Sequence, residues 1–480
     1  MLNFVLKKPV PVIIELPKTN EKGTGIMRTK SNKQQYFDFS YESRLKIVNE
    51  YREKYKLLSK LLDENPQLVS LVHQDLAKML SQSNKGRKSG YTSEQILRSL
   101  IIQFVEQQSY RDVVVLIENS EFLRNFVRLG DKPVMDYSFL NKAYGILREE
   151  TWQAINQAVA RYAAEQGKIS AEKLRMDTTV YETNIHYPTD SSLLWDSFRT
   201  LAGLLRRIQQ ELPQLALKHR FHDKKVKKLA YFITRNGASP KKWTQRKVKS
   251  TYRELIGRVT WIVGIARQVL LALNKADYEA QLLSHYLPIV DSIIAQADKR
   301  VFQGIMPAAD EKIYSLFEEH TELLKRGKAG KPIEFGHKIL LAQTGEKFIH
   351  HYRVFPKRQE DREMVAPAIK AHKQLFGISP DVLATDKGFY ESMEQIFALE
   401  ETITTVSICK KGRRNQREYE RESSEEFKDG QRFRAGCEGS ISVLKRAFNL
   451  GKCLFKGFKN YAASVGCAVF CHNLVLLTRL

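Results

Sequence analysis

The stretch KLRMDTTVYETNIHY, residues 173–187, decides the class of fold. It is rich in β-branched and aromatic residues, which favours a β-strand, and helical patterns lie on both sides of it. Asp177 stands in this stretch between Met176 and Thr178. A charged side chain inside a largely buried strand is hard to explain by structure alone. The stretch therefore predicts the first strand of a sheet, with a carboxylate on it.

Working outward toward the C-terminus, the sequence alternates between strand and helix patterns. We expect strands at 312–317, 335–342, 382–385 and 402–408. We expect helices at 364–375, 390–399 and from about 436 to 450. Together with residues 169–190, the segment 301–480 predicts a mixed sheet flanked by helices, an α/β or α+β architecture. Residues 191–300 have a long helical pattern and interrupt this domain as an insertion.

Toward the N-terminus the pattern is helical from 41 to 168. Thr92-x-x-Gln95 is a capping-box pattern, and Ser109 and Asp136 are placed as further helix caps. Short helices joined by tight turns are compatible with a helix-turn-helix DNA-binding domain. A helical domain without base contacts explains the pattern equally well. Residues 1–40 are rich in Lys, Pro, Gly and Asn, and predict a flexible basic arm.

The net charge of +24 and the pI near 9.6 indicate a polyanionic partner. Nucleic acid is the first candidate and an anionic membrane the second. A membrane anchor would need about 18 to 20 apolar residues, and the closest segment, Tyr461–Leu477, contains His472 and Asn473. We therefore expect this segment to be a buried helix, and the protein to bind nucleic acid without a membrane anchor.

Cysteine usage and the N-terminal residues favour the cytoplasm. In MLNFVLKKPVPVIIELPK, Lys7, Lys8 and three prolines break the apolar stretch, so the segment is unlike a signal peptide. The five cysteines predict reduced thiols rather than a disulfide framework. Cys467 and Cys471 are four residues apart, a spacing that suits a metal pair on a helix. Because no second pair lies nearby, core packing is favoured.

The helical insertion contains a strongly basic run. Residues 218–249 include twelve Lys or Arg and a single acid, Asp223. Such a run can be only a solvated face, but this imbalance favours contact with a DNA backbone. The densest part of the run consists of Lys224, Lys225, Lys227 and Lys228.

Two aspartates fall at strand positions that suit ligand binding. Asp386 ends the strand 382–385 and precedes a Lys387-Gly388 turn, and Asp177 lies on the first strand. Carboxylates near the strand ends of an open sheet point into the crevice where ligands bind. One such Asp is more often a cap or turn former. Two in one sheet indicate a hard cation such as Mg²⁺.

A third carboxylate comes from FRAGCEGSISVLKRAF, residues 433–448. On a helix, Arg434, Glu438 and Lys445 fall within about 40° of one another. An adjacent apolar stripe would pack on the sheet and place Glu438 at its rim; it consists of Ile441, Leu444 and Phe448. From spacing alone, a surface row of alternating charge explains the pattern equally well.

The sequence resembles the DDE transposases of bacterial insertion sequences, whose catalytic domain has an RNase H-like fold. The resemblance covers about 440 residues. It rests on MDTTVYETNIHYPTDSSLLWD (176–196), IYSLFEEHTELLKRGKAGKPIEFGHKILLAQ (313–343), VLATDKGFY (382–390) and FRAGCEGSISVLKRAFNLGKCLFKGFKNYAA (433–463).

Matched residue by residue, the resemblance implies that Asp177, Asp386 and Glu438 are the catalytic, metal-binding triad. Arg434 and Lys445 fall on the Arg and Lys of a Y-x2-R-x3-E-x6-K signature known in some branches and would hold phosphates. The Tyr position of this signature is Gln431 here, and the helical insertion follows the first strand, whereas some relatives carry theirs before the glutamate.

The resemblance also implies cofactors and partners. Two Mg²⁺ ions, with Mn²⁺ as a substitute, would clamp the scissile phosphate, and no nucleotide cofactor is expected. The partners would be double-stranded DNA, namely element ends with inverted repeats and a target, bound by a homodimer associated with the nucleoid. Two alternatives stay open: a non-mobile RNase H-like nuclease that only hydrolyses DNA, and a catalytically inactive DNA-binding relative.

Overall fold

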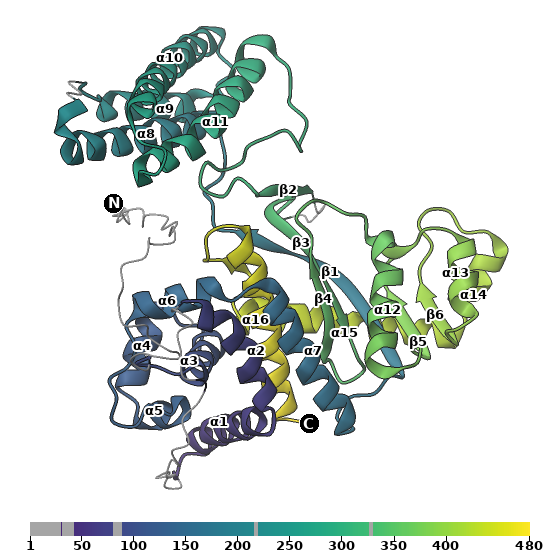
Figure 1. The fold of residues 1–480 in the computed structure, drawn as a ribbon. Coiled ribbons are helices and arrows are strands. Elements are labelled where there is room, and N and C mark those ends of the chain that lie inside the picture. Colours follow the sequence, from purple (N-terminus) through teal and green to yellow (C-terminus); the bar gives the residue numbers. More distant parts are fainter. Residues whose placement is uncertain (1–29, 31–42, 80–88, 216–218, 326–329) are drawn as a thin grey trace. The chain divides into compact units, whose positions relative to one another are not determined.

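The computed structural model describes Lys30 and residues 43–79, 89–215, 219–325 and 330–480 (Figure 1). The basic arm predicted at 1–40 lies outside the described residues apart from Lys30. The chain divides into two compact units, one comprising Met1–Tyr181 with Lys338–Leu480 and the other Glu182–His337. This division differs from the four segments expected from the sequence, because the N-terminal helices share a hydrophobic core with the sheet and the last helix.

The N-terminal part of the first unit is helical in its described residues. Its helices are α1 (Lys46–Glu64), α2 (Pro66–Leu76), α3 (Ser93–Val105), α4 (Tyr110–Glu118), α5 (Glu121–Val127), α6 (Tyr137–Ile146) and α7 (Glu149–Glu165). The predicted caps are confirmed: Thr92 and Gln95 form a full capping box on α3. The side chains of Ser109 and Asp136 accept hydrogen bonds from backbone N–H groups at the starts of α4 and α6.

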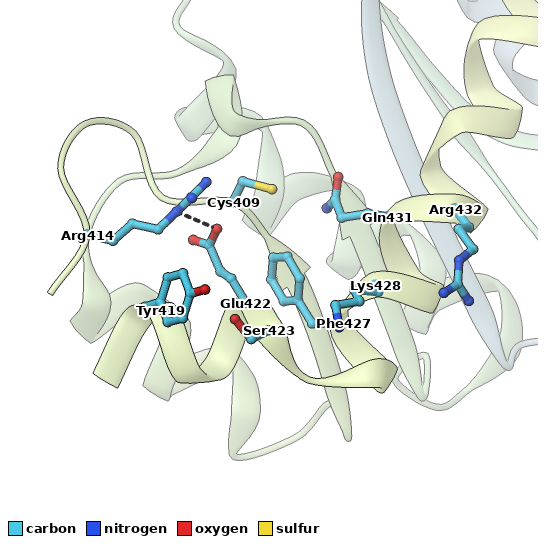
Figure 2. Close-up of a pocket in the computed structure, with 9 residues that line it drawn as sticks. All are labelled: Cys409, Arg414, Tyr419, Glu422, Ser423, Phe427, Lys428, Gln431 and Arg432. Carbon is cyan, nitrogen blue, oxygen red and sulfur yellow. Dashed lines mark ion pairs between the residues drawn. The ribbon is translucent and has the colours of Figure 1, made fainter. Parts of the chain in front are cut away.

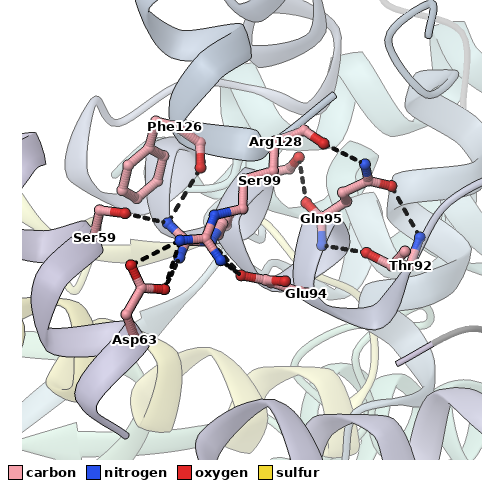
Figure 3. Close-up of polar contacts among 9 residues, drawn as sticks. Ser59, Asp63, Thr92, Glu94, Gln95, Ser99, Phe126 and Arg128 are labelled. Carbon is pink, nitrogen blue, oxygen red and sulfur yellow. Dashed lines mark hydrogen bonds and ion pairs between the residues drawn. The ribbon is translucent and has the colours of Figure 1, made fainter. Parts of the chain in front are cut away.

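A network of polar contacts ties three of these helices together (Figure 3). The guanidinium of Arg98 on α3 contacts Glu94 (3.0 Å), Asp63 of α1 (2.9 Å) and the carbonyl oxygen of Phe126 of α5 (3.2 Å). Arg128 pairs with the same two acids, at 2.6 Å each. Only 1% of the Arg98 side chain is exposed, so this network replaces nearly all the hydration that burial removes.

The sheet is mixed and has seven strands. These are β1 (Lys173–Thr183), β2 (Glu322–Lys325), β3 (Ile333–Gln343), β4 (Ile349–Val354), β5 (Val382–Thr385), β6 (Thr405–Ile408) and β7 (Lys452–Cys453). The order is β2-β3-β1-β5-β6, with β4 paired to β3 and β7 to β1. β1, β5 and β6 are parallel neighbours, whereas β3 pairs antiparallel with β2 and β4. The expected mixed α/β architecture is confirmed.

Besides the two-residue strand β7, which was not expected, two strand assignments differ from the sequence-based expectation. Residues 312–317 form no strand, and a short strand lies further on at Glu322–Lys325. The strand Ile349–Val354 was not predicted, because its IHHYRV sequence lacks a clear alternation of apolar and polar residues. Both are ladder partners of the long strand β3, which supplies backbone hydrogen bonds that the local pattern does not indicate.

Strand β1 presents different side chains to the two faces of the sheet. Leu174 and Met176 pack in a core with α12 (Val365–Phe376) and α13 (Met393–Glu400). Alternate residues point the other way, toward α15 (Glu425–Ala447). That face carries Tyr181 in a second core, shared with α16 (Phe458–Leu477) and the N-terminal helices. Asp177 therefore lies on the face of the sheet covered by α15.

The second unit contains the expected helical insertion. Its long helices are α8 (Asp190–Glu211), α9 (Asp223–Asn236), α10 (Lys242–Ala272) and α11 (Tyr278–Asp298). They enclose one hydrophobic core (Figure 1). The predicted apolar period on α10 is confirmed, since all its members are buried: Leu255, Val259, Ile262, Ala266 and Val269.

The predicted buried C-terminal helix is also confirmed. Within the described residues, α10 and α16 are long and apolar enough to cross a membrane by length and composition. The apolar window of α16 is 89% buried inside the fold, against 39% for α10. Cys467 and Cys471 are buried in α16, where they pack in the core as expected. All five cysteines of the chain are described and are free thiols.

Candidate active site

Two glycines allow α15 to lie directly against the sheet. A Cβ atom on Gly430 would stand 2.5 Å from Cβ of Ser407 on β6, and one on Gly436 would overlap the guanidinium of Arg175 on β1. Arg175 also donates a hydrogen bond of 2.9 Å to the carbonyl oxygen of Phe433. The helix is therefore held at backbone distance from β1 and β6.

The close approach brings Asp177 and Glu438 to one cation. Arg434 Nη1 lies 4.0 Å from Asp177 Oδ2, and Arg434 Nη2 donates to Glu438 Oε1 at 3.2 Å. Asp177 is 14% exposed and Arg434 21%, while Glu438 is 66% exposed at the rim. The predicted carboxylates on β1 and α15 thus lie on the same face of the sheet.

Asp386 stands at the end of the neighbouring parallel strand. The last pair of the β1–β5 ladder is Arg175 with Ala384, and Asp177 and Asp386 each lie two residues beyond it in the chain. Asp386 Oδ1 accepts a hydrogen bond of 2.7 Å from Gly388 N. It caps the short helix Lys387–Phe389 in this way. The carboxylate therefore has a structural role in the turn and lies at the end of the strand that pairs with β1.

Lys445 contacts the protein backbone. It lies on the side of α15 that faces the sheet, and Nζ donates to the carbonyl oxygen of Val180 on β1 at 3.0 Å. The apolar stripe expected beside it is present: Leu444 and Phe448 are buried and Ile441 is partly buried in the same core. Lys445 in this position fastens the second half of α15 to β1, three residues beyond Asp177.

A fourth carboxylate, which the sequence analysis did not identify, lies on the same edge of the sheet. Asp361 Oδ1 accepts hydrogen bonds from Lys338 Nζ (2.8 Å) and Thr178 Oγ1 (3.2 Å). A Cβ atom on Gly388 would stand 3.0 Å from Asp361 Oδ2 and 2.9 Å from Asp386 Oδ1. Asp361 begins the short 3-10 helix Asp361–Met364. The acids of the segment QEDRE (359–363) have no spacing that distinguishes it from a solvated turn.

The environment of Cys437 argues against a thiolate nucleophile. Burial and, next, the charge of Asp177 raise the pKa of the Cys437 thiol to about 12. The thiol therefore stays protonated at neutral pH, and it packs beneath the carboxylates as a small apolar group. The chemistry of this face must come from its carboxylates and cations.

A surface pocket of about 540 Å³ is lined by residues of α14 (Gln416–Ser423), of α15 and of the loop after β6 (Figure 2). Gln431 connects the pocket to the strands β5 and β6, because its Nε2 donates to the carbonyl oxygens of Thr385 (3.2 Å) and Ser407 (2.7 Å). The basic residues Arg414, Lys428 and Arg432 line the pocket. Acids offset this charge, since Glu422 also lines the pocket and pairs with Arg414, and Arg432 pairs with Glu425 and Asp429. Gln431 itself braces α15 against β5 and β6.

The basic run of the second unit lies on the outer surfaces of α9 and α10. Lys224, Lys225 and Lys228 are exposed and Lys227 is partly buried. In the described part of this unit, Lys225 is the one of these four with an ion-pair partner, Glu254 at 2.8 Å. Trp243 is exposed on the same surface, with Lys247 Nζ 5.3 Å from its ring. The single acid of the run, Asp223, pairs with Arg206.

Carboxylate oxygens are the ligand atoms that Mg²⁺ prefers. The side chains of Asp177, Asp386 and Glu438 are therefore of the right chemical type for a hard divalent cation. Within the described ranges, no three His, Cys, Asp or Glu side chains form a group that could hold a metal ion as they stand. The guanidinium of Arg434 occupies the position between Asp177 and Glu438.

Comparison of the chain with protein families, with curated proteins and with solved structures finds no match.

Proposed function

We propose that the protein is a DDE transposase with an RNase H-like catalytic domain, which cleaves DNA strands at element ends and joins them to target DNA. The observation that carries this proposal is the meeting of Asp177 and Glu438 at Arg434, beside the strand end that bears Asp386. Asp177 and Glu438 share one cation, and Asp386 follows the strand parallel to β1. Three carboxylates on this part of the sheet suit metal-assisted phosphoryl transfer.

Asp177, Asp386 and Glu438 would hold the divalent cations. Bound Mg²⁺ or Mn²⁺ would supply Lewis-acid stabilisation of the phosphodiester and an activated oxygen nucleophile. Arg434 neutralises part of the charge of Asp177 and Glu438. Once bound divalent cations neutralise these two carboxylates, Arg434 would be free to contact a DNA phosphate. Lys445 would keep α15, and with it Glu438, in place on β1.

Single substitutions of the three acids test the catalytic assignment. Asp177→Asn, Asp386→Asn and Glu438→Gln should each abolish strand cleavage and strand transfer, because each removes a charged cation ligand. DNA binding should persist or improve, since affinity comes from basic surface. Glu426→Gln, on an exposed position at the start of α15, is the matched control and should retain activity. Substantial cleavage by any one triad variant would overturn the assignment.

The salt dependence of binding tests the proposed DNA surface on α9. Lys224 and Lys228 are one helical turn apart and both exposed. If each meets a phosphate, Lys224→Gln with Lys228→Gln should flatten the log–log salt slope by roughly 0.9 per contact, for all DNA sequences alike. Lys275→Gln with Lys299→Gln, exposed in the same unit outside the run, is the control. Equal slopes for the two double variants would mean that the run is a solvated face.

A non-mobile nuclease on the same fold is the second candidate. It would keep the three carboxylates and cleave DNA, but it would not join a 3′-hydroxyl end to a second duplex. Inverted repeats on both sides of the gene would favour the transposase. An inactive DNA-binding relative is disfavoured by the presence of all three acids. Assaying cleavage and strand transfer on the same substrate separates the three functions.

A further inference from the structure

The Lys338–Asp361 ion pair occupies the edge of the sheet next to Asp386. Lys338 Nζ donates to Asp361 Oδ1 at 2.8 Å and to the carbonyl oxygen of Gln359 at 2.9 Å. The two side chains are only 14% and 22% exposed. Thr178, the residue after Asp177, donates to the same carboxylate oxygen at 3.2 Å. The pair thus joins β3, β1 and the short helix Asp361–Met364 that precedes α12.

Asp361 also supports the turn that carries Asp386. Its Oδ2 faces Gly388, whose N–H holds Asp386 Oδ1 at 2.7 Å. Because a Cβ atom on Gly388 would meet both carboxylates at about 3 Å, the turn is packed between them. A displacement of Asp361 would therefore loosen the contact that orients the Asp386 carboxylate.

We propose that the Lys338–Asp361 ion pair positions the carboxylate of Asp386. The pair keeps the Lys338 cation away from this carboxylate and fixes the turn that carries it. The inference rests on the proposed function. Lys338 is a buried cation that needs a counter-charge. Asp361 supplies it. If Asp361 is removed, the next carboxylate, on the other side of Gly388, is that of Asp386. Lys338 would then pair with Asp386 and compete with a divalent cation for its oxygens.

The first test is the binding of Mg²⁺ and Mn²⁺ to the full chain, measured by titration calorimetry without DNA. Asp361→Asn should raise the cation concentration for half-saturation by roughly 10- to 100-fold, the usual effect of losing a partner that orients a metal ligand. Glu363→Gln, which removes an exposed carboxylate from the same short helix, is the matched control and should bind as the unaltered protein does. Unchanged cation binding by Asp361→Asn would overturn the proposal.

A double variant separates positioning from direct ligation. In Asp361→Asn with Lys338→Met the competing cation is gone, so cation affinity should be higher than in Asp361→Asn alone, and the deficit that remains measures the loss of turn support at Gly388. If Asp361 were itself a cation ligand, the double variant would stay as weak as the single one, and the positioning role would be refuted. Thermal unfolding of both variants shows whether the sheet edge remains folded.

The same titration distinguishes failure of this inference from failure of the proposed function. Asp386→Asn and Asp177→Asn should lose cation binding whatever Asp361 does. If they lose it and Asp361→Asn does not, the positioning device alone is refuted. If neither affects cation binding, the proposed function fails, and the inference fails with it.

Discussion

The packing of α15 on the sheet makes a sharp prediction at Gly430. In Gly430→Ala the new methyl carbon would lie 2.5 Å from Cβ and 2.8 Å from Oγ of Ser407. Carbon atoms in contact are about 3.5 to 4.0 Å apart, so helix and strand must separate by about 1 Å. The Ser407 hydroxyl, which donates to the carbonyl oxygen of Phe427 at 2.9 Å, would be displaced as well.

The magnitude follows from two opposing effects. Overpacking of this kind costs about 1–3 kcal/mol, and replacing Gly by Ala within a helix gains up to about 1 kcal/mol. Gly439 on the same helix has open space around its Cβ position, so Gly439→Ala should show only the gain. The free energies of unfolding of the two variants should therefore differ by about 1–3 kcal/mol, with Gly430→Ala the less stable.

Urea unfolding followed by circular dichroism measures this difference as a shift in midpoint at constant slope. The same 1 Å displacement would move Arg434 and Glu438 relative to Asp177. Under the proposed function, strand cleavage should then fall by up to roughly 10²-fold. Equal stability of Gly430→Ala and Gly439→Ala would refute the close packing of α15 on β6.

Two further predictions concern stability. Arg98→Met should lower the free energy of unfolding by about 3 kcal/mol, the low end of the range for a broken buried ion pair. The loss stays at this end because Arg128 still neutralises Glu94 and Asp63. An unchanged urea midpoint would contradict this prediction. Burial lowers the pKa of both His351 and His472 to about 4. As the pH falls, these histidines are protonated in the unfolded chain before they are protonated in the folded one. The free energy of unfolding is therefore at its full value above about pH 6.5 and decreases toward pH 4, by up to about 3 kcal/mol per histidine. Midpoints measured from pH 7 to 4.5 check this, and His472→Gln should reduce the loss.

Local sequence determined the features that depend on neighbouring residues alone. The caps at Thr92, Ser109 and Asp136 could be predicted because each satisfies the exposed N–H groups of its own helix. The strand Val382–Thr385 was predicted with its exact bounds, since a short apolar run ends at a turn-forming Asp-Lys-Gly. The spacing of Arg434 and Glu438 likewise predicted one helical face, which their ion pair confirms.

Tertiary structure decided what depends on contacts distant in sequence. Helix α15 begins at Glu425, capped by Ser424, rather than near Gly436; its glycines weaken the local helical signal, and the packing of Gly430 and Gly436 on the sheet outweighs it. Lys445 is tied to β1, 265 residues away in the sequence. Asp361 lies across Gly388 from Asp386, and a lysine from β3 neutralises it there. Spacing within a segment cannot encode such partners, since the fold brings them together.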